Sequence, residues 1–266
     1  MSDNKGDNML VRVERDGPVT TVIINRPQAR NAVDRPTADA LAAAFLEFEN
    51  DNNARVAVLC GEGGTFCAGA DLKAISRGEN LYHPDHAEWG FAGYARHFID
   101  KPTIAAVNGS ALGGGTELVL ASDLAVAEEG ATFGLPEVKR GLLAAAGGVF
   151  RIVDQLPRKV ALELIFCGEA ISAARAAELG LLNQVVPNGD ALSAALALAE
   201  RIGGNAPLSV QASKRVALGA QGGVIPTEVP KWEQTTREYS VLKLSSDAKE
   251  GPLAFAEKRQ PVWTAS

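Results

Sequence analysis

The sequence has few cysteines and histidines, and neither residue type forms a recognisable site. Its three cysteines are an odd and sparse set, whereas a secreted domain held together by disulfides usually carries an even number of them. The nearest approach to a metal site, formed by His83, Asp85 and His86, lacks a fourth ligand. We therefore expect a reducing, cytoplasmic location and no bound metal.

The sequence also lacks an excess of positive charge and long apolar runs. Both absences bear on whether the protein binds nucleic acid or a membrane. The chain carries 26 Lys and Arg against 32 Asp and Glu, for a net charge of −6, whereas nucleic-acid-binding proteins usually present a basic surface. No apolar run approaches the roughly 18 residues of a membrane-spanning helix, and the opening MSDNKGDNML lacks the apolar core of a signal peptide. We expect neither nucleic acid nor a membrane as a partner, although a few local Lys and Arg can hold a polyanionic small ligand.

The chain does have the length and the apolar content for a sizeable core. Its 266 residues are 46% hydrophobic, which suits one large domain or a domain with an appendage. A polar lead over residues 1–8 is predicted to be disordered. The patterns predict a β-hairpin over 11–25, helices over 37–48 and 116–122, strands over 56–59, 103–107 and 123–127, and mainly helix from residue 151 onward. Strands that alternate with glycine loops and helices, followed by a helical tail, predict an α/β fold with a helical appendage.

Two glycine loops follow predicted strands. GEGGTFCAGAD begins at Gly61 and NGSALGGG begins at Asn108. Neither contains the Gly-Lys-Ser/Thr of a P-loop or the third glycine of a dinucleotide-binding fingerprint. They can be tight turns between packed elements. Alternatively, each presents backbone N–H groups at a helix start, and two such groups aimed at one oxygen form an oxyanion hole. Spacing alone leaves both interpretations open.

Two glutamates lie beside tight backbone and are the candidate acid–base pair. Glu117 follows the second glycine loop at a predicted helix start, and Glu137 lies in FGLPEVKRG beside a proline. Two carboxyl groups in one site cannot both ionise cheaply, so one keeps a proton, which gives an acid and a base at neutral pH. Taken alone, however, each glutamate is more often a solvated residue at a helix start, favoured by the helix dipole.

Six segments spread along the chain are more specific than any single glycine loop. They are INRPQARNAVD, GTFCAGADLK, KPTIAAVNGSALGGGTELVLASD, FGLPEVKRG, ISAARAAELGLLNQVVP and FAEKRQPVW. In order and spacing they resemble the crotonase, or enoyl-CoA hydratase/isomerase, family over roughly residues 10–263. The resemblance implies a crotonase-like spiral of ββα units over residues 1–200 that binds acyl-CoA. It also implies a helical C-terminal region over 201–266 that assembles homotrimers, often paired into homohexamers.

The resemblance implies roles for residues of both glycine loops. The N–H groups of the oxyanion hole would belong to Ala70, in Gly69-Ala70-Asp71, and to Gly114, the middle glycine of the second loop. Gly69 and Asp71 would belong to the same substrate-binding loop. The carbonyl oxygen of Ala68 would accept a hydrogen bond from the adenine amino group of coenzyme A.

Three basic residues are implied as contacts to coenzyme A. Arg30 and Lys73 would contact its phosphates, and Lys258, in the terminal FAEKR, would reach the nucleotide held by a neighbouring subunit. Coenzyme A is then part of the acyl-CoA substrate, and no separate cofactor is expected.

The two glutamates decide which reaction the resemblance implies. Family members that hydrate usually keep both to hold one water, whereas members that only isomerise often keep one; this chain has Glu117 and Glu137. Many hydratases carry a Pro-Gly pair where this chain reads Ala144-Ala145, but the Ala145 N–H can still help to hold the water. The resemblance therefore implies an enoyl-CoA hydratase. The alternatives are a Δ3,Δ2-enoyl-CoA isomerase or another thioester-enolate enzyme and, from a different class, a non-catalytic acyl-CoA binder.

An aromatic group in residues 77–100 has two interpretations. Trp89, Phe91 and Tyr94 lie close together among glycines that oppose one regular helix. The rings can line an acyl pocket and set the preferred chain length, or they can pack onto the core as aromatic residues often do.

Overall fold

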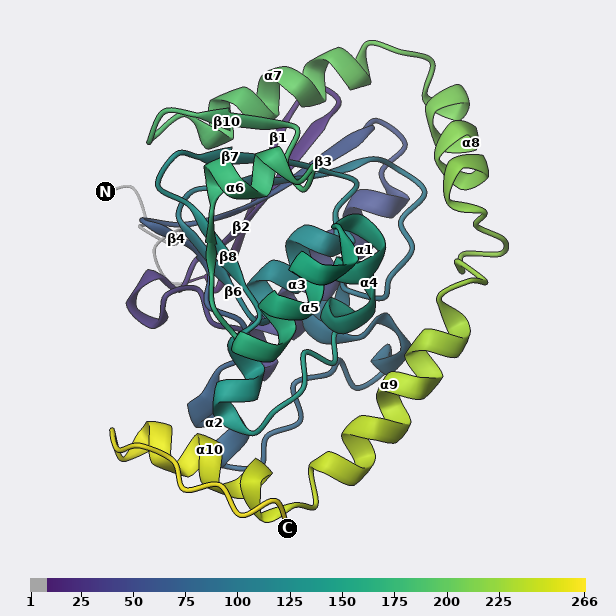
Figure 1. Ribbon diagram of the computed structural model, residues 1–266. Helices are drawn as coiled ribbons and strands as arrows, with labels where there is room; N and C mark the ends of the chain where they lie inside the picture. The colour runs from purple at the N-terminus through teal and green to yellow at the C-terminus, as the bar shows by residue number, and fades with distance from the viewer. Residues whose placement is uncertain (1–8) are drawn as a thin grey trace, which may run out of the picture.

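The computed structural model describes residues 9–266, whose strands form two separate sheets (Figure 1). The larger sheet has six strands in the order β1-β2-β3-β5-β7-β10, and the smaller has four in the order β4-β6-β8-β9. The strands are β1 (Val11–Asp16), β2 (Val19–Ile24), β3 (Val56–Gly61), β4 (Thr65–Cys67), β5 (Thr103–Val107), β6 (Ser110–Leu112), β7 (Leu124–Glu128), β8 (Thr132–Gly134), β9 (Ile171–Ser172) and β10 (Gln184–Val186). The disordered lead predicted over residues 1–8 lies outside the described residues.

Helices cover the sheets and continue beyond them. They are α1 (Arg35–Asn50), α2 (Leu72–Ser76), α3 (Gly114–Ala121), α4 (Gly148–Gln155), α5 (Arg158–Cys167), α6 (Ala173–Glu178), α7 (Ala191–Gly203), α8 (Pro207–Leu218), α9 (Val229–Leu242) and α10 (Ser246–Ala256). Short 3₁₀ helices lie in the loops as η1 (Pro27–Ala29), η2 (Ala87–Trp89), η3 (Phe91–Gly93) and η4 (Pro136–Arg140). The predicted α/β fold is confirmed, and the predicted hairpin, strands and first two helices lie within two residues of these bounds.

The middle of the larger sheet is buried on both faces, which explains the nearly continuous apolar runs of β3 and β5. Successive side chains of a strand point to opposite faces. Leu59 of β3 therefore joins the core completed by Phe45 of α1, whereas Val58 joins the core completed by Ala199 of α7. From β2 to β10 the neighbouring strands are parallel, and parallel strands covered on both faces are apolar at nearly every position.

The prediction of mainly helix after residue 151 is confirmed, but it missed two short strands. β9 pairs with β8 in the smaller sheet, and β10 extends the larger sheet by pairing Val185 with Ala127. Both strands have three residues or fewer, too few to show a period. Their conformation is set by pairing with strands far away in the sequence rather than by local preference.

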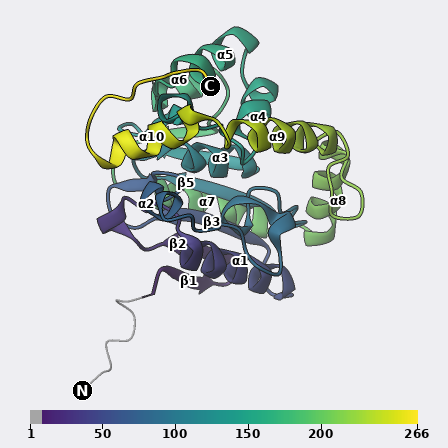
Figure 2. The same ribbon diagram turned by 90° about the horizontal axis from the view of Figure 1, so that it is seen from below.

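The last three helices form an arm around the outside of the molecule. Figures 1 and 2 show α8, α9 and α10 following one another along its periphery, with α10 returning to the side of α2. Apolar side chains on this arm are exposed, among them Leu208, Val216 and Val241. The assembly of trimers or hexamers through residues 201–266 stays a prediction. No helix within residues 9–266 is long and apolar enough to cross a membrane.

Candidate active site

The smaller sheet brings three loops to one edge. Its strands β4, β6 and β8 are parallel, with Cys67 opposite Ala111 and Leu112 opposite Gly134. Parallel strands end at the same edge of a sheet, where ligands of α/β proteins usually bind. The segments that follow the three strands, 68–71, 113–115 and 135–137, therefore come together.

The first two of these loops touch backbone to backbone. A Cβ atom placed on Gly69 would lie 2.8 Å from the Gly114 nitrogen, and one placed on Gly114 would lie 3.2 Å from the Gly69 Cα. A Cβ on Gly115 would collide with the carbonyl oxygen of Cys67. Glycine is needed here because two backbones approach more closely than a side chain permits. The approach sets the loop that carries Ala70 against the first turn of α3.

The N–H groups of Ala70 and Gly114 have no acceptor within residues 9–266. Ala70 is held on both sides, because the Val33 N–H donates to the Gly69 carbonyl at 2.8 Å and the Asp71 N–H donates to the Val33 carbonyl at 2.9 Å. Gly114 is the first residue of α3, where an N–H has no acceptor inside the helix. Two fixed donors on adjoining loops can bind one oxygen that becomes negatively charged.

Glu117 lies in the first turn of α3 and is 4% exposed. Its Oε1 accepts a hydrogen bond from the Gly148 N–H at 2.8 Å. Burial raises the pKa of Glu117, while the N–H groups of Gly148 and Ala146 and the positive charge of Arg151 oppose the rise. The carboxyl group is thus removed from water but keeps partners that favour its ionised form.

Glu137 reaches the same place from η4. Its Oε1 would lie 2.8 Å from a Cβ atom placed on Gly113, so the carboxyl group lies against the turn that begins α3. Its Oε2 is buried and has no hydrogen-bond partner among the described residues. Burial raises the pKa of Glu137, and the charge of Glu117 raises it further. Glu137 therefore holds a proton more readily than an ordinary glutamate, and its unpartnered oxygen is available to a ligand.

A buried hydroxyl fixes the Glu137 loop to α3. The Thr116 hydroxyl lies 2.7 Å from the Ala111 carbonyl oxygen and 2.9 Å from that of Gly134, and it accepts from the Gly134 N–H at 3.0 Å. The Gly113 N–H also donates to the Gly134 carbonyl, at 2.8 Å. These bonds hold the end of β8, three residues before Glu137, against the start of α3.

The arrangement can stabilise an oxyanion and move protons beside it. Two N–H groups without an acceptor among the described residues and two buried carboxyl groups with raised pKa values meet at one edge of the smaller sheet. Carboxyl groups in such a setting can act as base and acid near neutral pH. Among residues 9–266, no group of three His, Cys, Asp or Glu side chains could hold a metal ion.

The residues predicted to contact coenzyme A lie around the first glycine loop. Arg30 and Lys73 are exposed, as side chains that bind phosphates at a surface can be. The Ala68 N–H donates to the Arg30 carbonyl at 3.0 Å, whereas the Ala68 carbonyl accepts no backbone hydrogen bond in the described part of the chain. The Asp71 carboxylate is used within the protein, because it caps α2 and pairs with Arg26. Asp71 thus has a structural role that the sequence did not predict.

Two other predicted contacts lie in later segments. Ala145 precedes α4, and its N–H has no backbone acceptor within residues 9–266, so it can serve a ligand. Lys258 is exposed just after α10, and its reach to a neighbouring subunit stays a prediction.

The aromatic group of residues 77–100 divides into three separate environments. Tyr94 is buried, stacks on Phe45 with ring centroids 4.3 Å apart and has its hydroxyl 2.9 Å from the Ser122 hydroxyl, so it packs onto the core, as the second interpretation expected. Trp89 stacks between His86 and His97, at 3.8 Å and 4.1 Å. Only Phe91 of the three borders the proposed oxyanion hole, because its Cε1 would lie 2.5 Å from a Cβ atom on Gly114.

Sequence reasoning missed three residues that shape the site. Gly148, which holds Glu117, belongs to a Gly-Gly pair before a helix, a pattern that could have indicated another N–H donor. Arg26 lies in the INRP segment, but its partner Asp71 is 45 positions away. Arg151 is a buried cation on α4 with no local signal of its role.

This chain is similar to known proteins over nearly its whole length. Residues 14–266 match the family model described as enoyl-CoA hydratase/isomerase. A carnitinyl-CoA dehydratase of Salmonella paratyphi A is 40% identical over 262 residues, which cover 95% of this chain and 97% of that protein.

Solved structures are also similar to this chain over nearly its whole length. A carnitinyl-CoA hydratase from Mycobacterium avium has a TM-score of 0.94 and 65% identity, over 97% of this chain and 99% of that one. An enoyl-CoA hydratase from Mycobacterium tuberculosis has a TM-score of 0.75 and 44% identity, over the same shares of 97% and 99%. These similarities confirm the predicted crotonase-like fold.

Proposed function

Because the chain belongs to the enoyl-CoA hydratase/isomerase family, as its motifs predicted, we propose that it adds water across the 2,3 double bond of an enoyl-CoA thioester. In reverse, the same site would remove water from a 3-hydroxyacyl-CoA. The observation that carries the proposal is the convergence of two buried carboxyl groups, those of Glu117 and Glu137, on two backbone N–H groups that have no acceptor in the described part of the chain.

The first part of the mechanism is polarisation of the thioester. Its carbonyl oxygen would lie between the N–H groups of Ala70 and Gly114, which are already fixed before the substrate arrives. Donors fixed in this way favour the state in which the oxygen is most negative. They draw electron density through the conjugated double bond away from the β-carbon, which becomes the position that water attacks.

The second part is addition of water. Glu117, whose carboxylate is supported by the Gly148 N–H, takes a proton from the water as the water oxygen bonds to the β-carbon. The π electrons of the double bond move to the thioester oxygen, which forms an enolate held by the two N–H groups. The Ala145 N–H helps to hold the water.

The third part returns the electrons and balances the protons. Glu137, which burial and the charge of Glu117 keep protonated, gives its proton to the α-carbon as the thioester carbonyl forms again. The proton that Glu117 received then restores Glu137 through solvent. The product gains one hydrogen and one hydroxyl, and coenzyme A stays attached throughout.

The names of the relatives refine the substrate. We infer that the acyl group is that of carnitinyl-CoA, a 3-hydroxyacyl thioester whose chain ends in a trimethylammonium group. Support comes from proteins of that name at 40% and 65% identity over at least 95% of this chain. Loss of water from this substrate gives a conjugated enoyl thioester, so the chemistry of the site is unchanged.

The test follows the absorbance band of the conjugated enoyl thioester. A hydratase removes the band of a 2-enoyl-CoA, an isomerase given a 3-enoyl-CoA creates it, and a binder does neither. We expect loss of the band with the 2-enoyl thioester, and no change in it would contradict the proposed function.

The substrate is tested separately in the same assay. Two 2-enoyl-CoA substrates of equal length are compared, one ending in trimethylammonium and one in a neutral tert-butyl group of similar shape. A higher kcat/KM for the cationic substrate is expected. A higher value for the neutral one would overturn carnitinyl-CoA as the substrate and leave hydration intact.

A further inference from the structure

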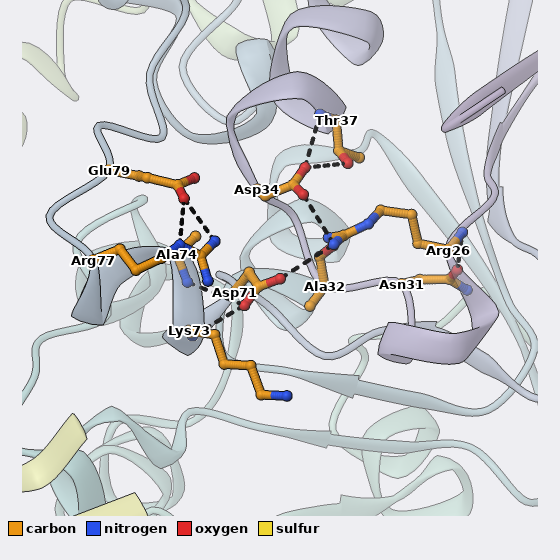
Figure 3. A network of polar contacts seen from close by, with 10 residues as sticks. All are labelled: Arg26, Asn31, Ala32, Asp34, Thr37, Asp71, Lys73, Ala74, Arg77 and Glu79. Carbon is orange, nitrogen blue, oxygen red and sulfur yellow. Dashed lines mark hydrogen bonds and ion pairs between the residues drawn. The ribbon is translucent and has the colours of Figure 1, made fainter. Parts of the chain in front are cut away.

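Arg26 links the starts of two helices through Asp34 and Asp71 (Figure 3). It lies between β2 and η1, and its side chain is only 13% exposed. One guanidinium nitrogen, Nη2, contacts Oδ2 of Asp34 at 2.9 Å and Oδ2 of Asp71 at 3.2 Å. The other, Nη1, donates to the carbonyl oxygen of Ala32.

Each of the two aspartates divides its oxygens between Arg26 and a helix. Oδ1 of Asp34 accepts the Thr37 N–H at 3.0 Å and caps α1. Oδ1 of Asp71 accepts the N–H groups of Lys73 at 3.0 Å and Ala74 at 3.3 Å and caps α2. Figure 3 shows the two carboxylates above and below the same end of the guanidinium group. A single cation thus connects the N-termini of two helices.

The residues directly before these two aspartates pair with each other in a β-bridge that holds Ala70. Val33 precedes Asp34, Ala70 precedes Asp71, and Val33 and Ala70 form a parallel bridge. Arg26 therefore joins the side chains of the two residues that directly follow the bridge, Asp34 and Asp71. The orientation of the peptide that carries the Ala70 N–H depends on the Val33 and Asp71 backbone bonds, and Arg26 keeps their two strands of chain in register.

We propose that Arg26 is a positioning residue for the oxyanion donor Ala70, a role that rests on the proposed function. Loss of the guanidinium would leave Asp34 and Asp71 facing each other as like charges, which repel. Lysine would not replace it, because one ammonium group lacks the planar fork that serves both carboxylates and the Ala32 carbonyl. A shift of the donor by about 1 Å lowers the rate by up to about 10²-fold.

Steady-state kinetics give the first test. Arg26→Gln should lower kcat by about 10- to 10²-fold with little change in KM, because the misplaced donor acts mainly on the transition state. The matched control is Arg35→Gln, since Arg35 pairs with Asp39 at 2.9 Å on the surface of α1 and should keep parental kcat. Circular dichroism must show that each variant is folded; if Arg26→Gln does not fold, Arg26→Lys replaces it, with a loss of kcat in the same range.

A spectroscopic test separates positioning from a merely structural role. Cinnamoyl-CoA is bound in a Glu137→Gln background that does not turn it over, and the absorbance band of the conjugated thioester is recorded. Polarisation by the oxyanion hole moves this band to longer wavelength. With Arg26 intact the shift should be present, and with Arg26→Gln or Arg26→Lys most of it should be lost although the probe still binds.

The outcomes distinguish the two claims. A full shift in the folded Arg26 variants would overturn the positioning role and leave the proposed function standing. No shift in the background with Arg26 intact would overturn the oxyanion hole itself, and with it both claims. Loss of the shift in the Arg35→Gln control as well would also overturn the specific role of Arg26.

Discussion

The two sheets of this molecule differ in size, composition and task. In the larger sheet, β2, β3 and β5 have five or six residues each, all of them buried. In the smaller sheet, no strand exceeds three residues, and glycines in the loops that follow its strands let the backbones approach each other closely. Both sheets bury apolar side chains, Phe66 and Phe133 among those of the smaller one, but only the smaller sheet aligns the loops that carry Ala70, Gly114 and Glu137.

This difference predicts that stability and chemistry can be changed separately. Buried apolar side chains contribute most of the free energy of folding, and the larger sheet supplies many of them. The loops of the smaller sheet contain a buried carboxyl oxygen without a partner and N–H groups without acceptors, which are costs to stability. Substitutions in the loops of the smaller sheet should therefore lower kcat with little loss in the free energy of unfolding. Substitutions in the larger sheet should lower the free energy of unfolding with little change in kcat.

The largest effect is expected at the smaller sheet. Glu137→Gln preserves shape but removes proton transfer, so kcat for hydration should fall by about 10²- to 10⁴-fold, with no loss of thermal stability. The control is Glu129→Gln, because Glu129 is exposed in the turn after β7. Near-parental turnover by Glu137→Gln would show that its proton is not used.

The converse is expected in the larger sheet. Leu59 is 1% exposed in β3, and Leu59→Ala should lower the free energy of unfolding by about 2–5 kcal/mol through lost burial and the cavity left behind. The kcat of the folded protein should stay close to the parental value. Urea unfolding and kinetics below the transition measure both, and a large fall in kcat without a loss of stability would break the separation between the sheets.

A substitution at Thr116 should lower both the free energy of unfolding and kcat, each by less than the substitutions above. Thr116→Val removes the hydroxyl that joins α3 to the end of β8 and leaves buried backbone groups unsatisfied, at a cost of about 1–3 kcal/mol. Because the same bonds hold the Glu137 loop, kcat should also fall, by less than in Glu137→Gln. A variant that lost stability but kept parental kcat would show that the hydroxyl does not position Glu137.

The smallest effect is a pH dependence of stability. Burial raises the pKa of Glu137, so above the unfolded value of about 4.3 the folded state binds more protons than the unfolded state. This contribution to stability is fully present below the unfolded pKa and is lost as pH rises through the raised pKa. Glu137→Gln should remove it, and urea unfolding across pH should show a weaker fall in stability for the variant. Equal pH dependence in parent and variant would contradict the raised pKa.

The sequence predicted those features that a local residue pattern or the family resemblance indicates. The period of apolar residues predicted α1, and continuous apolar runs predicted β3 and β5. The resemblance identified Glu117 and Glu137, which neither composition nor spacing could distinguish from solvated glutamates.

The features that were missed depend on contacts across long stretches of chain. Gly148 holds Glu117 from 31 positions away, and Arg26 meets Asp71 across 45 positions. Tyr94 and Phe91 are aromatic neighbours in sequence, yet one enters the core and the other borders Gly114. No local pattern encodes such pairings, because they arise only when the two sheets fix the loops in space.

The most direct test of water addition at the smaller sheet traces where the atoms go. The enzyme is given a 2-enoyl-CoA in water enriched in heavy oxygen, and in a parallel reaction in heavy water, and the product is analysed by mass spectrometry. Hydration predicts one heavy oxygen on the β-carbon and one deuterium on the α-carbon in the parent, with both nearly absent in Glu137→Gln. Deuterium uptake without heavy oxygen in the parent, as an isomerase would give, would contradict it.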